Sequence, residues 1–325
     1  MSKPKVFVTR VIPDKGLDLV KYFCEVDLWE SEVPPSRAEL LQHIRGVDGL
    51  LSLLTDQIDA EVIDAAGSQL KVISNFAVGF DNIDVSAATA RKIPIGNTPD
   101  VLTDSTADFA FALMLSAGRR ILEGNRYVRD GKWQTWGPML LLGIEMKGTT
   151  LGLVGFGRIG KAMARRAMGF DMRVIYYDPN ETEFDSDVKA TQVDLETLLK
   201  ESDFISLHTP LTSATHHLID SEALSKMKSS AVLINTSRGP VVDMDALYEA
   251  LKAKRIFAAG LDVTEPEPLR ANHPLLTLDN VVIVPHIASA TKAARDKMAW
   301  LAAKNLIAGL KGEHLPNCVN PQVYK

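Results

Sequence analysis

Three side chains suited to acid–base chemistry stand shortly after apolar runs in the C-terminal half of the chain. They are Arg238, Glu267 and His286. Ligands of open α/β sheets gather outside the carboxyl ends of the strands, so we expect these side chains to meet there. Arginine offers a planar fork for a carboxylate and can polarise a keto oxygen, and histidine can supply a proton as a hydride reaches the carbon. The set therefore suits the reduction of a 2-keto acid.

Each of these residues also has a plainer interpretation. Arg238 could be a surface residue in a turn, and His286 a buried histidine with satisfied hydrogen bonds. Glu267 lies in a proline-rich loop, where solvated acids are common, and Glu265 is a rival for its role. A carboxylate beside the histidine would hold it protonated and oriented, but residue types alone leave the choice of acid open.

A glycine pattern, G-x-G-x-x-G, stands at Gly155, Gly157 and Gly160. The run Leu151–Val154 before it predicts a buried strand, and an apolar i, i+4, i+8 pattern from Ile159 predicts a helix. The first glycine permits a tight turn, the second lets a pyrophosphate approach the backbone, and the third lets helix pack on strand. The helix N-terminus would face the phosphates. The alternative is a glycine turn in an ordinary βα unit.

Asp178 predicts which dinucleotide is used. It ends a second apolar strand, 173–177, and lies about 20 residues past the glycines, where an acid bonds the adenosine ribose. Such an acid repels the 2′-phosphate of NADPH, and no arginine follows it through Glu181, Thr182 and Glu183. We therefore expect NADH to be preferred over NADPH.

Size and composition exclude several classes of function. The 325 residues suffice for two α/β domains, and the net charge of -5 leaves no basic footprint for nucleic acid. The two cysteines, Cys24 and Cys318, have no metal-ligand spacing, which favours a reducing cytoplasm. The N-terminus has no apolar signal core, and no apolar run reaches the ~18–20 residues of a membrane span.

Short apolar strands alternate with helical patterns along the whole chain. Unbroken runs of this kind are typical of parallel strands buried on both faces, and so of doubly wound α/β architecture. We expect one long helix over residues 104–130, apolar all round in its first half and lying between domains or subunits, and a last helix over 293–310 that returns to the first domain. The expected strands are 6–9, 49–54, 71–75, 151–154, 174–177, 204–208, 231–235, 258–262 and 281–284.

Four dispersed segments resemble the motifs of the D-isomer-specific 2-hydroxyacid dehydrogenases: Gly155–Gly160, Asn235–Gly239, Gly260–Leu269 and Pro285–Thr291. His208–Thr212 resembles a further family motif, and the similarity extends to Leu315–Pro321. The resemblance implies two doubly wound parallel-sheet α/β domains. A Rossmann NAD-binding domain, 103–289, would be inserted into a flavodoxin-like substrate-binding domain, 1–102 plus 290–325.

The resemblance also implies the roles of individual residues. The catalytic set is Arg238, Glu267 and His286, and it selects Glu267 over Glu265. His208 is not catalytic, and His216 and His217 are surface residues without a family role. The implied cofactor contacts are Thr103, Gly155, Gly157, Arg158, Ile159, Gly160, Asp178, Thr209, Pro210, Thr236, Ser237, Asp262 and Ala288. The implied substrate contacts are Leu53, Val78, Gly79, Arg238, Ser289 and Trp136, with the backbone N–H groups of Val78 and Gly79 holding the substrate carboxylate.

Within the family, the N-terminal domain looks most like the glyoxylate/hydroxypyruvate reductases. Phosphoglycerate dehydrogenases are the nearest alternative, but their phosphate calls for Arg or Lys, and Leu51–Thr55 and Asn75–Phe76 hold no cation. Phosphite dehydrogenases place a lysine at Val78, and formate dehydrogenases look more distant. A nicotinamide-sensing corepressor of the same family would carry a long extra tail, and a purely structural NAD-binding module would not need all three catalytic groups.

An apolar surface predicts self-association. The stretch Ala107–Leu115 and the loop Trp133–Leu142 are too hydrophobic to face water comfortably. The family resemblance implies a two-fold homodimer in which Trp136 approaches the partner's active site. The alternative is that both tryptophans of this loop, Trp133 and Trp136, pack within their own chain.

Overall fold

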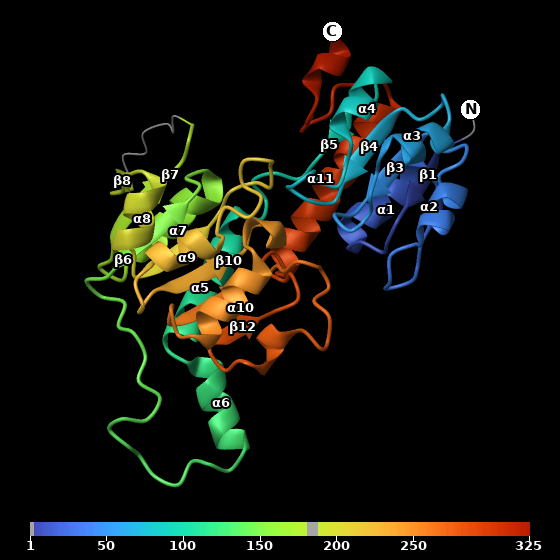
Figure 1. Ribbon diagram of the computed structural model, residues 1–325. Helices are drawn as coiled ribbons and strands as arrows, with labels where there is room; N and C mark the ends of the chain where they lie inside the picture. The colour runs from blue at the N-terminus through green and yellow to red at the C-terminus, as the bar shows by residue number, and fades with distance from the viewer. Residues whose placement is uncertain (1–2, 181–187) are drawn as a thin grey trace. The chain divides into compact units, whose positions relative to one another are not determined.

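The computed structural model describes residues 3–180 and 188–325, which divide into two compact units (Figure 1). Unit 1 comprises Met1–Leu102 and Ala290–Lys325, and unit 2 comprises Thr103–Ser289. No described helix combines the length and apolar character needed to cross a membrane. The chain thus leaves unit 1 after its fifth strand and returns to it for its last long helix.

Unit 1 contains a five-stranded parallel sheet in the order β2-β1-β3-β4-β5. This order is flavodoxin-like, as expected. Helices cover both faces, because successive strand residues such as Phe7 and Val8 belong to separate buried clusters. The strands are β1 (Lys5–Val8), β2 (Glu25–Leu28), β3 (Gly49–Ser52), β4 (Val72–Asn75) and β5 (Ile95–Gly96). The helices are α1 (Asp14–Phe23), α2 (Arg37–His43), α3 (Ala60–Ala66), α4 (Val85–Ala90) and α11 (Lys292–Leu310).

Unit 2 contains a seven-stranded parallel sheet in the order β12-β11-β10-β9-β6-β7-β8. The chain begins in the middle at β6, winds outward to one edge, and then crosses back to β9. This is the Rossmann order, and the switch point lies between β6 and β9. The strands are β6 (Thr150–Val154), β7 (Arg173–Tyr177), β8 (Thr191–Gln192), β9 (Phe204–Leu207), β10 (Val232–Asn235), β11 (Ala258–Leu261) and β12 (Val281–Ile283). The helices are α5 (Thr103–Gly118), α6 (Ile121–Arg129), α7 (Arg158–Met168), α8 (Leu195–Glu201), α9 (Ser221–Lys226) and α10 (Met244–Lys252).

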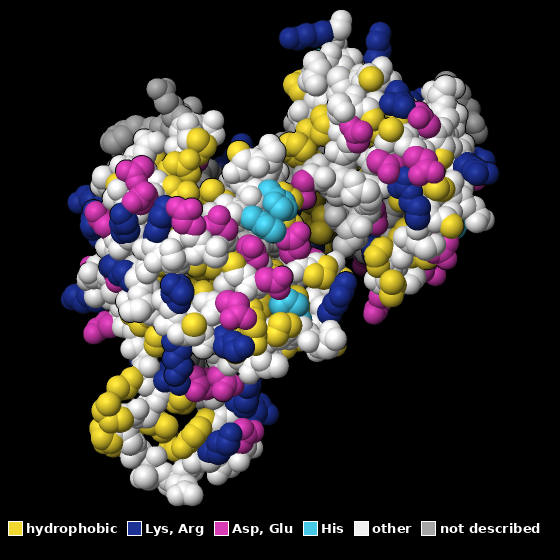
Figure 2. Space-filling model, viewed as in Figure 1, with side chains coloured by type: hydrophobic (Ala, Val, Ile, Leu, Met, Phe, Trp, Pro, Cys, Tyr) yellow, Lys and Arg dark blue, Asp and Glu magenta, His cyan; other side chains and the backbone are white. Residues whose placement is uncertain are grey.

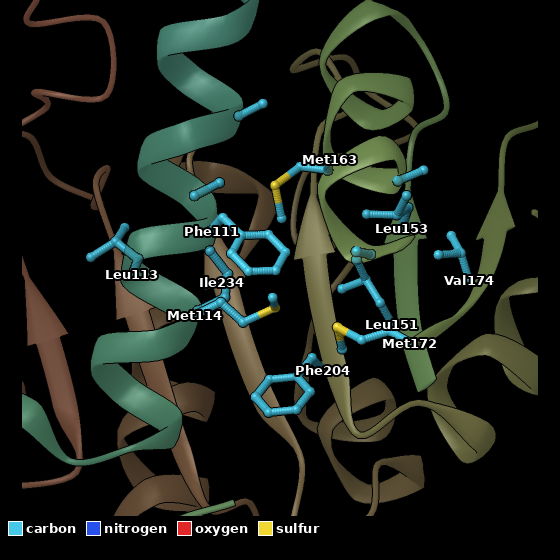
Figure 3. Packing of buried hydrophobic residues seen from close by; sticks show 14 of the residues in the cluster. Phe111, Leu113, Met114, Leu151, Leu153, Met163, Met172, Val174, Phe204 and Ile234 are labelled. Atoms are coloured by element: carbon cyan, nitrogen blue, oxygen red, sulfur yellow. The ribbon is translucent and has the colours of Figure 1, made fainter. Parts of the chain in front are cut away.

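The core of unit 2 has two layers, one on each face of the sheet. Helices α5 and α7 cover one face, where Phe111, Met114 and Met163 pack on strand residues such as Leu151 and Ile234 (Figure 3). Helices α8, α9 and α10 cover the other face. The doubly wound prediction is therefore confirmed for this sheet as well.

Most of the helices in both units have an aspartate, serine or threonine at the N-cap, the residue just before the first helical residue. Each of these side chains accepts a hydrogen bond from a backbone N–H of the first turn and so satisfies a donor that the helix cannot. Helix α7 differs from these, because the N-cap residue before it is Gly157, which has no side chain to offer. The capping residues are Ser36, Asp59, Asp84, Asp194, Asp220, Asp243 and Thr291.

The prediction of one long helix over 104–130 is wrong. The chain forms α5 and α6 with a break at Arg120, whose φ of 54° is left-handed. The buried side chains of α5 belong to the core of unit 2. We call residues 119–143 the arm, which in Figure 1 extends away from the sheet of unit 2. Its two ends meet, because the N–H of Ile144 donates to the Gly118 carbonyl at 2.9 Å.

Every strand predicted from the sequence is present, but β2, β5 and β8 were missed. β5 and β8 are only two residues long, and β8 is exposed. β2 lies at the edge of its sheet and alternates between exposed and half-buried positions, so it has no continuous apolar run. The final helix, α11, packs on α1, β3 and β4 of unit 1 as expected.

Candidate active site

The glycine turn between β6 and α7 is built for close approach. Gly155 has φ +92°, and a Cβ there would lie 2.7 Å from the carbonyl oxygen of His208. A Cβ at Gly160 would lie 2.3 Å from the Gly155 oxygen. The protein's own packing therefore requires the first and third glycines.

Gly157 differs from the other two glycines of the turn, because no contact that the structure describes requires a glycine there. A Cβ at this position would meet no heavy atom of the described residues within 4 Å, and its φ is -74°. Neither packing nor conformation requires glycine here. A pyrophosphate lying against the backbone N–H groups at the start of α7 would require it, so the residues present fit the cofactor.

A buried hydroxyl supports the same fit. Thr236 follows β10 and is 8% exposed. Its Oγ1 has no hydrogen-bond partner among residues 3–180 and 188–325. Buried polar groups are nearly always satisfied, so this hydroxyl is suited to a ligand group at the carboxyl edge of the sheet.

Asp178 directly follows β7 and lies beside the glycine turn. Its Oδ2 accepts a hydrogen bond from the Phe156 N–H at 2.9 Å, and its Oδ1 accepts one from the Asn180 N–H at 3.0 Å. These bonds orient the carboxylate while leaving it half-buried. Residues 181–183, on which the expectation of no following arginine partly rests, lie outside the described residues.

Three adjacent strands carry the three candidate catalytic side chains. Arg238, Glu267 and His286 follow β10, β11 and β12, which pair in parallel in that order. All three loops therefore leave the same carboxyl edge of the sheet. The Nδ1 of His286 lies 2.5 Å from Oε1 of Glu267, and their side chains are 22% and 35% exposed.

The rival acid faces a different histidine. Glu265 Oε2 lies 3.0 Å from Nε2 of His217. The carboxylate that contacts His286 is thus that of Glu267 and not that of Glu265. His208 is held neutral, because burial lowers its pKa to about 3, and its Nε2 lies 2.9 Å from the Ser206 hydroxyl.

Asp262 fixes the loop that carries His286. Its two carboxylate oxygens accept hydrogen bonds from the N–H groups of Ile287, at 2.6 Å, and Ala288, at 2.9 Å. Its carbonyl accepts from the His286 N–H at 2.8 Å. Burial raises the pKa of Asp262. His286 itself has a φ of 52°, so these bonds hold it in a left-handed conformation that a side chain rarely adopts.

Asn235, a residue to which the sequence assigned no role, fixes the Arg238 loop. It is fully buried, its Oδ1 accepts from the N–H and the hydroxyl of Ser237, and its Nδ2 donates to the Arg238 carbonyl at 2.8 Å. Gly239 then presses this loop against the next, because a Cβ there would lie 1.9 Å from the Thr264 oxygen. The Arg238 and Glu267 loops are therefore in backbone contact.

The remaining cofactor candidates surround the same edge of unit 2. Thr103 is the first residue of α5, and Thr209 and Pro210 follow β9 at the switch point. Arg158 and Ile159 open α7, and Ile159 packs on the core. The structure thus places most of the predicted cofactor residues on loops after β6, β7, β9, β10, β11 and β12.

The predicted carboxylate loop lies in unit 1, after β4. The carbonyls of Val78 and Gly79 accept hydrogen bonds from Asn97, at 2.8 Å, and Asn75, at 3.0 Å. Within the described part of the chain, no acceptor is found for the N–H of either residue. Both donors are thus left for a ligand while the loop itself is held by its carbonyls.

A buried amide, Asn82, ties the Leu53 loop to this one, a link that the sequence analysis missed. Its Nδ2 donates to the carbonyls of Leu53, at 3.0 Å, and Asp56, at 2.9 Å, while its Oδ1 accepts from Asn75 at 3.0 Å. The Leu53 N–H donates to the Asp56 carboxylate at 2.7 Å. The sequence shows only an ordinary asparagine seven positions after the strand 71–75.

The arm leaves its large apolar side chains exposed. Trp133 is 60% exposed and Trp136 is 78% exposed, so the alternative that both pack within their own chain is wrong. Helix α6 buries none of its residues. Figure 2 shows hydrophobic side chains lining this part of unit 2. Ser289, the last residue of unit 2, is half-buried.

Unit 2 therefore combines a nucleotide-binding sheet with an Arg, Glu and His set at its carboxyl edge. Residues 111–288 match the family model described as the D-isomer specific 2-hydroxyacid dehydrogenase, NAD binding domain. The chain belongs to this family and is an enzyme of it, with an NAD(P)-binding domain.

Relatives place the chain more closely within the family. It is 54% identical to a glyoxylate reductase of Korarchaeum cryptofilum, over 99% of this chain and 98% of that one. A solved structure from Thermus thermophilus is 48% identical, with a TM-score of 0.91, and the match covers 97% of this chain and 99% of that one. An NADPH-dependent glyoxylate/hydroxypyruvate reductase from Sinorhizobium meliloti is 32% identical, with a TM-score of 0.86, over 98% and 97% of the two chains.

Proposed function

We propose that this enzyme reduces glyoxylate and hydroxypyruvate, to glycolate and D-glycerate, with NADH. The observation that carries the proposal is the contact of 2.5 Å between His286 and Glu267, on loops beside that of Arg238. The substrates follow from the similarity to glyoxylate reductases. We place the reaction in the cytoplasm, whose reducing conditions suit the free thiols Cys24 and Cys318.

The chain's own residues would divide the work as follows. The Arg238 guanidinium binds the substrate carboxylate and polarises the keto oxygen. His286 donates a proton to that oxygen from the ring nitrogen that faces away from Glu267. Glu267 orients the ring through its contact of 2.5 Å with Nδ1. NADH, when bound, supplies the hydride.

Asp178 is the basis for proposing NADH rather than NADPH. Its carboxylate would accept hydrogen bonds from the ribose hydroxyls and repel a 2′-phosphate. Relatives include an NADPH-dependent enzyme, so the preference needs its own measurement. The ratio of kcat/KM for NADH and NADPH decides it: equal values for the wild type would refute the proposal.

We propose that unit 1 is the substrate-binding domain and unit 2 the cofactor-binding domain. In unit 1 we propose the N–H groups of Val78 and Gly79 as donors to a substrate carboxylate and Leu53 as an apolar wall. In unit 2 we propose Arg238 and Ser289 as substrate contacts. The segments 51–55 and 75–76 carry no cation, so a phosphorylated substrate should be used poorly.

A substrate panel tests this function directly. Purified protein is assayed with NADH and glyoxylate, hydroxypyruvate or 3-phosphohydroxypyruvate, with His286→Asn as the control for background oxidation. We expect turnover of the first two, with the D isomer formed from hydroxypyruvate. If the phosphorylated acid is the best substrate, the phosphoglycerate dehydrogenase alternative replaces this proposal. If none is turned over while NADH binds, the regulator alternative does.

We also propose a homodimer formed through the arm. Burial of Ile121, Leu122 and Val128, which are 46–52% exposed, together with the arm tryptophans, would remove a large apolar surface from water. By family resemblance, Trp136 would approach the partner's site and narrow its substrate pocket.

Subunit exchange tests the role of Trp136. Trp136→Ala and His286→Asn chains are mixed, and substrate preference is measured. In the mixed dimer, the site with an intact His286 faces an arm that retains Trp136, so it should recover the wild-type preference. A preference that stays that of Trp136→Ala, or a monomer in sedimentation, contradicts the proposal.

A further inference from the structure

A second group of donor side chains lies outside the proposed catalytic set. His216, His217 and Glu265 each offer one ligand atom, and these atoms all lie within 4.8 Å of one another. His216 is exposed, and the other two are half-buried. In the part of the chain that the structure describes, this is the one group of three His, Cys, Asp or Glu side chains with such spacing. Histidine side chains lie open on the face of the molecule seen in Figure 2.

Backbone contacts bring the three residues together from two distant segments. The His217 N–H donates to the Pro240 carbonyl at 2.8 Å. The adjacent Gly239 packs on Thr264, whose oxygen would lie 1.9 Å from a Cβ there. Both segments are therefore fixed to the same short stretch after β10. The fold consequently holds the backbones of the two segments beside each other.

The donor set is that of a zinc ion. Zn²⁺ takes imidazole nitrogen and carboxylate oxygen at about 2.0–2.2 Å in a tetrahedron, and two histidines with one glutamate form a known three-ligand set that leaves a position for water. His217 Nε2 and Glu265 Oε2 are already 3.0 Å apart, close to the roughly 3.3 Å between neighbouring ligands of such a tetrahedron. The His216 ring stacks on that of His217 with centroids 4.0 Å apart, and its exposure lets it rotate toward a shared ion.

We propose that His216, His217 and Glu265 form a binding site for one Zn²⁺ ion per chain. The ion would tie the turn after β9 to the loop after β11. Glu265 precedes Glu267 by two positions in that loop, so the bound ion restrains the segment that carries the proposed partner of His286. Only this last consequence rests on the proposed function, and the binding itself does not.

Calorimetric titration of the full chain with Zn²⁺ tests the site. We expect one ion per chain, and affinity lowered by at least roughly tenfold in His216→Ala and in Glu265→Gln, since even the loss of an outer-shell partner has that effect. His314→Ala is the matched control, because His314 is an exposed histidine of unit 1 that stacks on Tyr324, and it should bind as the wild type does. Thermal unfolding checks that each variant is folded. Zinc should raise the Tm, compared with the Tm in the chelator EDTA, only where the site is intact.

Other outcomes overturn the proposal. Absence of binding to the wild type would leave His217 and Glu265 as a surface ion pair. Equal affinity in all variants, or binding that is lost in His286→Asn but kept in His216→Ala, would place the ion elsewhere. Replacement by Co²⁺ gives an independent check, because tetrahedral coordination by these ligands has a visible absorption band that His216→Ala should lack.

Discussion

Gly157→Ala should weaken NADH binding without destabilising the fold. A Cβ at this position meets no heavy atom within 4 Å among the described residues, and its φ of -74° and ψ of -159° suit alanine. In contrast, the neighbouring Gly160 has the Gly155 oxygen only 2.3 Å from its would-be Cβ. Of the three glycines in the turn, Gly157 is thus the one whose substitution reports on the ligand and not on the packing.

Two small terms set the expected change in stability. Replacing glycine restricts the unfolded chain and stabilises by about 0.4–1 kcal/mol. Alanine is a poorer N-terminal helix residue than glycine, by about 0.5 kcal/mol. The free energy of unfolding should therefore stay within about 0.5 kcal/mol of the wild type. If the methyl group displaces one hydrogen bond to a charged phosphate, worth about 1.5–3 kcal/mol, the Kd for NADH should rise roughly ten- to hundredfold.

Gly239→Ala is the matched comparison and should behave in the opposite way. Its Cβ would lie 1.9 Å from the Thr264 oxygen, so the two loops must move apart. Overpacking of this kind costs about 1–3 kcal/mol, and a displacement of about 1 Å between Arg238 and Glu267 can lower kcat by about 10². The Kd for NADH should rise less than in Gly157→Ala, because the turn Gly155–Gly160 is unchanged.

Urea unfolding and fluorescence titration with NADH separate the two effects. If Gly157→Ala binds NADH as tightly as the wild type, the turn does not approach a pyrophosphate and the prediction is wrong. A larger loss of stability in Gly157→Ala than in Gly239→Ala would also contradict it.

Three further predictions concern single side chains. His286→Asn should lower kcat by ~10²–10⁴ with little change in the Kd for NADH, as expected for a general acid; normal turnover would remove His286 from the mechanism. Asp178→Ala should lose part of the preference for NADH, measured as the ratio of kcat/KM for the two cofactors; an unchanged ratio would mean that another group selects the cofactor. Burial raises the pKa of Asp262 above its ordinary value of 3.8. Between these two pKa values, the carboxyl group stays protonated in the folded chain and is ionised in the unfolded chain. The free energy of unfolding should therefore fall as the pH rises from 3.8 through the folded-state pKa. Asp262→Asn should lack this decline in urea unfolding measured across that range, and parallel curves would contradict the assignment.

Apolar periodicity was sufficient to predict the interior of both sheets. Runs such as Leu151–Val154 and Val232–Asn235 are buried on both faces, and only such strands lack alternation. The glycine spacing predicted the turn because two of its requirements are local: Gly155 has a left-handed φ of +92°, and a Cβ at Gly160 would lie 2.3 Å from the Gly155 oxygen. The edge strand β2 buries none of its residues, so it needs no continuous apolar run and its sequence pattern is weak.

What the sequence could not predict depends on contacts between distant segments. Asn82 is an ordinary amide in the sequence and becomes a link between two loops only when β3 and β4 are paired. His217 and Glu265 are separated by 48 positions, and Gly239 brings their segments together. The break at Arg120 was missed because arginine is a good helix former, and the local sequence does not show that Gly118 is hydrogen-bonded to Ile144.

The hydrogen bond of 2.9 Å between Ile144 and Gly118 makes the arm a self-contained insertion. A chain that passed directly from Gly118 to Ile144 would keep α5 and β6 where they are, because those ends already touch. A change in the length of the arm should therefore leave the sheet of unit 2 in place. In this architecture, changes in the arm would act on the proposed association and on the pocket that Trp136 would narrow, while the loops of Arg238 and Glu267 are held by their own packing.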